Sequence, residues 1–156
     1  MKSKLLRNTH DGSLTECKIR PQGDETVVEF AIQYYRREDG EERNVSGVLR
    51  FSHVASVDLE VNFFDNPIGA ELGGFYEILD EDLKRRMLEK VFQNRKDGYL
   101  VHGDYDYDPE EPADILNFRP PMEEMLGELE QYRLFQQQTQ GGIYHILCKC
   151  YELIEG

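Results

Sequence analysis

The feature that most constrains this fold is a β-hairpin whose register can be read from the sequence. Asp39-Gly40 is a dipeptide typical of two-residue hairpin turns. Around this turn the alternating apolar residues face one another, which predicts the pairs Tyr34–Val45, Ile32–Gly47, Phe30–Leu49 and Val28–Phe51. On the other face, opposite charges meet at the spacing where they stabilise a sheet: Glu29 with Arg50, and Arg37 with Glu42. We therefore expect a hairpin with one apolar and one polar face.

Further strands are expected on both sides of this hairpin. Apolar and polar residues alternate over 55–63, which predicts a third strand and hence an antiparallel meander. Residues 14–20, 75–79 and 99–107 are also expected to be strands. Residues 143–154 are rich in apolar side chains, so we place this last strand inside the sheet. The sequence leaves open whether residues 122–138 form a helix or a strand.

Residues 80–96 are predicted to form a helix. Asp80 suits the N-cap, acidic residues follow it, and cations precede the stop at Asp97-Gly98. One stripe of this helix is apolar and is expected to cover the meander: Leu83, Met87, Leu88, Val91 and Phe92. The predicted fold class is α+β, a single domain over 1–156. It has a mainly antiparallel sheet of about five to six strands with an N-terminal meander, and one or two helices packed on the apolar face.

The charge of the chain restricts its partners. The net charge is −13, and residues 97–156 carry 13 acidic residues against Arg119, Arg133 and Lys149. Nucleic acids and anionic lipids bind through Lys and Arg, so we expect neither as a partner, whereas a basic protein is a suitable one. The acidic bias also has a simpler explanation, because surface charge keeps a protein in solution.

The cysteines and the N-terminus favour a cytoplasmic protein. There are three cysteines without paired spacing, no apolar run at the N-terminus, and no stretch of the length that a spanning helix needs. Cys148, Cys150, Cys17 and His145 resemble a zinc set on paper. On a strand, however, Cys148 and Cys150 share one face and His145 points to the other. We therefore expect buried cysteines that act as small apolar side chains, with neither a metal nor a cofactor.

The most concentrated group of chemically active residues lies at 102–108. On a strand, His102, Asp104, Asp106 and Asp108 would point to one side, where a cation or an acid–base pair is conceivable. The aspartates resemble the start of a calcium loop, but Pro109 and Ile115 stand where that loop needs Gly and Glu. We found neither a nucleophile elbow nor a phosphate-binding glycine motif. An acidic structural loop is the simplest interpretation, and the balance is against an enzyme.

The leading functional hypothesis is a non-catalytic module that binds a basic protein, with the surface character of an inhibitor or an immunity protein. Carboxylates with interleaved tyrosines suit such an interface. The residues assigned to it are Asp58, Glu60, Asp104, Tyr105, Asp106, Tyr107 and Asp108. Two alternatives remain open. One is a metal-dependent or small-molecule enzyme or ligand-binding protein centred on His102 and Asp104, and the other is a subunit of a structural homo-oligomer.

Overall fold

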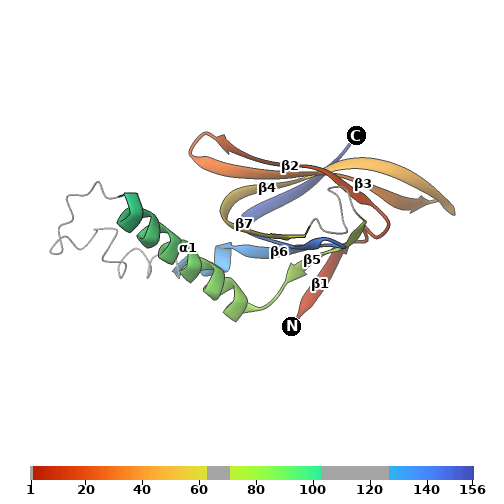
Figure 1. Ribbon diagram of the computed structural model, residues 1–156. Helices are drawn as coiled ribbons and strands as arrows, with labels where there is room; N and C mark the ends of the chain where they lie inside the picture. The colour runs from red at the N-terminus through yellow and green to blue at the C-terminus, as the bar shows by residue number, and fades with distance from the viewer. Residues whose placement is uncertain (1, 63–70, 103–126) are drawn as a thin grey trace. The chain divides into compact units, whose positions relative to one another are not determined.

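The computed structural model describes residues 2–62, 71–102 and 127–156. The chain divides into two compact units, one formed by residues 1–80 with 133–156 and the other by residues 81–132. The first unit contains the strands, and the second contains the helix (Figure 1). That residues 1–156 form one domain stays a prediction.

The strands of the first unit form one antiparallel sheet. Its order is β1-β5-β6-β7-β4-β3-β2. The strands are β1 (Ser3–Arg7), β2 (Ser13–Gln22), β3 (Glu25–Glu38), β4 (Glu41–Val61), β5 (Leu72–Ile78), β6 (Arg133–Thr139) and β7 (Gly142–Glu155). Because the described residues also include one helix of regular length, the fold is mainly antiparallel sheet of the α+β kind. The expected strand number of five to six was too low, because β1 was not recognised.

The predicted hairpin is confirmed in every pair. Val28, Phe30, Ile32 and Tyr34 of β3 face the expected partners of β4, and the charged pairs of the other face are also in register. Asp39 and Gly40 have φ angles of 51° and 82°. Both values are positive, as the tightest hairpin turns require. Local turn chemistry and alternation were therefore sufficient to set this register.

The meander, in contrast, was wrong in its third strand. Residues 55–61 continue β4, so that β4 runs without a turn from Glu41 to Val61. The residues between the two halves do not turn back: His53 has a φ angle of 51°, and the register with β7 shifts between Val54 and Ser56. Such a bulge bends a strand without ending it. The strand that pairs with the hairpin on the other side of β3 is β2.

Three of the other predicted strands are confirmed. The segments at 14–20, 75–79 and 143–154 correspond to β2, β5 and β7, and β7 lies inside the sheet between β6 and β4. The open question at 122–138 is answered in its second half, where β6 begins at Arg133. A short 3-10 helix, η1 (Leu129–Gln131), precedes it.

The sheet curves so that its apolar face encloses the core. In Figure 1, β2, β3 and β4 arch over β5 and β6. Ser13 at the start of β2 forms an isolated antiparallel bridge with Glu71, next to β5. Aromatic side chains from β4 and β5 meet in this core, where the ring centroids of Phe51 and Phe75 are 6.0 Å apart. The core residues include Leu14, Val28, Phe30, Ile32, Tyr34, Leu49, Phe51, Leu72, Phe75, Phe135, Tyr144, Ile146 and Cys148.

The helix α1 of the second unit runs from Glu81 to His102. It begins where the capping pattern predicted, but it does not stop at Asp97-Gly98. The strand predicted from residue 99 is therefore wrong over 99–102, since one glycine inside a helix costs only about 1 kcal/mol. Within this unit Lys84 is buried and donates to the carbonyl of Tyr132 at 3.2 Å. That the apolar stripe of α1 packs on the sheet stays a prediction.

Candidate functional site

Carboxylates gather where several strands of the sheet end together. Asn62, after β4, donates its backbone N–H to the carbonyl of Gly141 at 2.6 Å. Gln140 donates to the carbonyl of Glu71 at 3.0 Å, and Leu72 donates to that of Gly12 at 2.9 Å. These bonds join the end of β4, the β6–β7 turn and the starts of β5 and β2. We call the acidic side chains of this end of the sheet the acidic rim; its members are Asp11, Asp58, Glu60 and Glu71.

Asp58 and Glu60 lie on the strand as the sequence predicted. Both are exposed, and they pair in register with His145 and Ile143 of β7. The His145 ring also lies 3.1 Å from Oε1 of Gln136. Burial lowers the pKa of His145, although the two carboxylates oppose this effect. The imidazole is therefore mainly neutral at pH 7 and does not compensate the acidic charge.

Asp11 and Glu71 form a pair of like charges. The Asp11 carboxyl group beside it, together with desolvation, raises the pKa of Glu71 above its usual range, while His10 opposes the shift. Asp11 is exposed and has a φ angle of 62°. The other side-chain contact of Glu71 is neutral, since Nε2 of Gln140 donates to its Oε2 at 2.6 Å. The fold thus holds two carboxyl groups against each other, an arrangement that a cation relieves.

The backbone of the acidic rim is tightly packed at Gly142. This residue has a φ angle of 157°, and a Cβ atom there would lie 1.6 Å from the carbonyl oxygen of Glu60. Only glycine fits at this approach of β7 to β4. The close approach fixes the position of the Glu60 backbone next to the β6–β7 turn.

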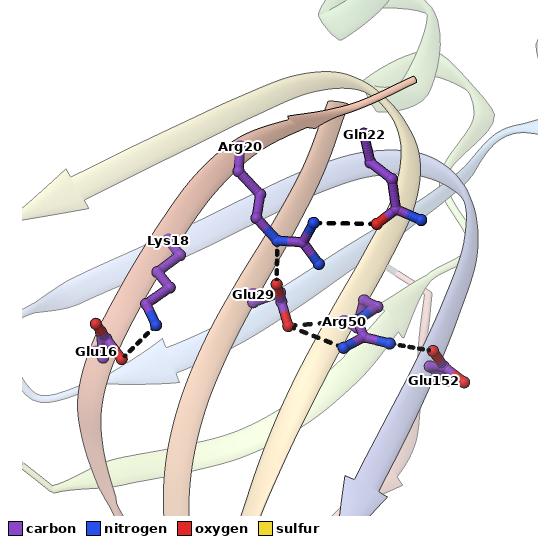
Figure 2. Close-up of polar contacts among 7 residues, drawn as sticks. All are labelled: Glu16, Lys18, Arg20, Gln22, Glu29, Arg50 and Glu152. Carbon is purple, nitrogen blue, oxygen red and sulfur yellow. Dashed lines mark hydrogen bonds and ion pairs between the residues drawn. The ribbon is translucent and has the colours of Figure 1, made fainter. Parts of the chain in front are cut away.

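On the polar face of β2, β3, β4 and β7, in contrast to the acidic rim, acidic side chains are paired with basic ones. Figure 2 shows Glu29 between two arginines: Nε of Arg20 lies 2.6 Å from Oε1, and Nη2 of Arg50 lies 3.2 Å from Oε2. Arg50 also reaches Glu152 at 3.2 Å, and Lys18 reaches Glu16 at 3.3 Å. These three acidic and three basic side chains form the charge ladder. The two arginines lower the pKa of Glu29, with Arg20 contributing most.

Most of the other predicted site residues lie outside the described part of the chain. Asp104, Tyr105, Asp106, Tyr107 and Asp108 belong to that group, so their role stays a prediction. His102 is the last residue of α1. The acid–base and cation hypotheses required His102 to share a strand face with Asp104. Because His102 lies in a helix, that arrangement is wrong for His102.

The cysteine prediction was correct for one residue in three. Cys148 is buried in the core, whereas Cys17 and Cys150 are exposed. Cys148 and Cys150 therefore differ in burial, although both pair with β4 without a register shift between them. His145 does lie on the face opposite Cys148. Among the residues that the structure describes, no three His, Cys, Asp or Glu side chains are grouped as a metal would require.

Sequence reasoning missed Asp11 as a member of the site. The signal was present in Asp11-Gly12, a turn dipeptide directly before β2. Glu71 was not assigned to a site either. Its neighbour Asp11 is 60 positions away in the sequence, and the two come together through the bridge from Ser13 to Glu71 and the bond from Leu72 to Gly12.

Comparisons with protein families, curated proteins and solved structures gave no match to this chain. Within the described ranges, no helix has both the length and the apolar character needed to cross a membrane.

Proposed function

We propose that this chain is a non-catalytic protein-binding module that holds a basic partner at the acidic rim. The backbone contacts that bring Asp11-Gly12 and Glu71 to the same end of the sheet are the observation that carries this proposal, and the raised pKa of Glu71 agrees with a carboxyl group beside it. Two acidic groups in contact disfavour the doubly charged state. A Lys or Arg side chain placed between them would remove the repulsion and form charge-assisted hydrogen bonds.

The surroundings of the acidic rim favour a protein partner over a free cation. Ile143, the register partner of Glu60, is 39% exposed. An exposed aliphatic side chain beside a carboxylate offers both the apolar contact and the polar edge that protein interfaces need. The sequence also has no Lys or Arg between Arg50 and Lys84, so the local field is negative along this whole stretch.

The segment from Asp104 to Asp108 is proposed as a second part of the same interaction, because its tyrosines and aspartates suit a basic surface. A cytoplasmic setting is likewise proposed. Both come from sequence, and neither depends on the acidic rim.

The proposal is tested by capturing a partner from native lysate and then measuring its association rate with purified variants. The rim variant carries Asp11→Asn, Asp58→Asn, Glu60→Gln and Glu71→Gln. A control variant removes the same charge from exposed positions elsewhere, with Asp24→Asn, Glu41→Gln, Glu89→Gln and Glu130→Gln. We expect the rim variant to slow association at least about tenfold at low salt and to flatten its salt dependence.

The control variant decides whether position matters. If it slows association as much as the rim variant does, net charge alone explains binding, and the acidic rim is not the site. Loss of binding after Asp104, Asp106 and Asp108 are changed to Asn, with the rim variant unaffected, would move the site to that segment.

A further inference from the structure

The first unit contains a hollow between two strand edges that have no strand partner among the described residues. β1 is the first strand of the sheet order and, within the described ranges, pairs with β5 alone. β3 pairs with β2 only as far as Gln33, so Tyr34–Glu38 have β4 on one side and no described strand on the other. Residues from both edges line one hollow of about 520 Å³: Leu5, Leu6, Arg7, Asn8, Tyr34, Tyr35, Arg36, Arg37 and Glu42.

The lining shows that these walls are strand edges. Four consecutive residues contribute on each side, 5–8 and 34–37. Consecutive residues of a strand point to opposite faces, so a surface that touches all of them runs along the backbone. Unpaired strand edges of this kind are templates for another strand.

The chain between β1 and β2 holds this hollow open. Gly12 still lies against β3, where a Cβ atom would meet the carbonyl oxygen of Gln33 at 2.3 Å. Thr9 is fully buried, however, and its hydroxyl donates to the carbonyl of Gly73 and accepts from Nε2 of Gln137. These bonds tie the chain to β5 and β6, and so β1 does not continue the ladder that β2 forms with β3.

The charge of the hollow is opposite to that of the protein. Three arginines and one glutamate line it, in a chain of net charge −13. In the described part of the chain, Arg7 and Arg37 form no ion pair. Arg36 contacts Glu155 and Glu38, but its Nε is buried without a hydrogen-bond partner among the described residues. The hollow therefore favours carboxylates in its occupant.

We propose that an extended acidic peptide segment of a partner protein adds as a strand between β1 and β3. Its backbone would pair with the two open edges, and its carboxylates would meet Arg7, Arg36 and Arg37. A second hollow of about 270 Å³ shares Leu6 and Arg7 and is lined further by Leu49, Phe75, Tyr151, Glu152 and Leu153. Its leucines and aromatic rings offer an apolar contact for alternate side chains of the peptide. This site is separate from the acidic rim and takes the opposite charge.

The test uses blocked hexapeptides and NMR titration of the full chain. The first probe alternates glutamate and valine, the second alternates lysine and valine, and the third is the first probe with alternate amides N-methylated. We expect the glutamate peptide to bind and to shift the amide signals of residues 5–8 and 34–37. The lysine peptide should leave the amide signals of residues 5–8 and 34–37 unshifted, and any binding of it at the acidic rim would shift other signals. N-methylation should weaken binding at least about tenfold, because it removes the donors of one strand edge.

Variants then locate the charge. Arg7 is exposed, so Arg7→Gln should leave the fold intact and raise the Kd of the glutamate peptide about tenfold. Lys18→Gln on the polar face of β2 makes the same change in net charge and should alter the Kd less than about twofold. Equal binding of the N-methylated peptide, shifts centred elsewhere, an unchanged Kd in Arg7→Gln, or no binding at about 1 mM would each overturn the proposal.

Discussion

The charge ladder and the acidic rim use carboxylates in opposite ways. In the charge ladder, each acidic group lies next to a basic one from the same or a neighbouring strand, and Glu29 lies between two arginines. In the acidic rim, Glu71 lies against a second carboxyl group instead. The pKa of Glu29 is lowered and that of Glu71 is raised. Charge that is matched across strands therefore stabilises the sheet, whereas unmatched charge is retained at some cost to stability and suits binding.

Charge reversal should separate the two regions most clearly. Glu29→Lys places a third cation between Arg20 and Arg50 at a side chain that is only 14% exposed, and we expect it to lower the free energy of unfolding by about 2–4 kcal/mol. Glu60→Lys changes an exposed side chain and should stay within about 0.5 kcal/mol. Urea denaturation measures both. Similar losses in the two variants would contradict the distinction.

Neutralising Glu29 should have a smaller effect that depends on pH. Glu29→Gln is expected to cost about 1 kcal/mol at pH 7, because both arginines exchange a charged acceptor for a neutral amide oxygen. The folded state lowers the pKa of Glu29, so the stabilisation is present above the unfolded-state pKa of about 4.3 and disappears as pH falls through the lower folded-state value. Urea denaturation of parent and variant between pH 7 and pH 3 should therefore converge at the acidic end. A difference that stays constant with pH would refute this.

Neutralising Glu71 should have the smallest effect and the opposite sign. Its pKa is raised in the folded state, so the folded state loses stability as pH rises through that value. Glu71→Gln keeps a partner for Asp11 and removes the repulsion, and we expect a slightly higher Tm at pH 7 with no gain at pH 4. Asp11→Asn should do the same. If the double variant adds both gains in full, the two carboxyl groups do not interact.

The success of the sequence predictions followed the distance over which each structure forms. The β3–β4 register depends on Asp39-Gly40 and on side chains within twelve positions of it, and every predicted pair was correct. The start of α1 at Glu81 was equally local. The continuity of β4 through His53 was not predictable, because a long strand with one left-handed residue and two short strands have the same alternation of side chains. The end of α1 was misplaced because Asp97-Gly98 disfavours a helix without forbidding it.

The candidate site divides in the same way. Alternation alone put Asp58 and Glu60 on one exposed face of a strand, and the structure agrees. The contact between Asp11 and Glu71 needs the bridge that closes the curved sheet, and the sequence between them contains no sign of it. The same holds for Arg7, whose place opposite β3 depends on where Thr9 anchors the chain that follows β1.

The sequence by itself determined the hairpin, the faces of its strands and the acidic character of the chain, because turn geometry and side-chain alternation act between near neighbours. Only the tertiary structure decided the strand order, the continuity of β4 and the two edges left open around Arg7. Those features depend on how distant segments pack around a shared aromatic core, and many pairings satisfy the same alternation until that packing selects one.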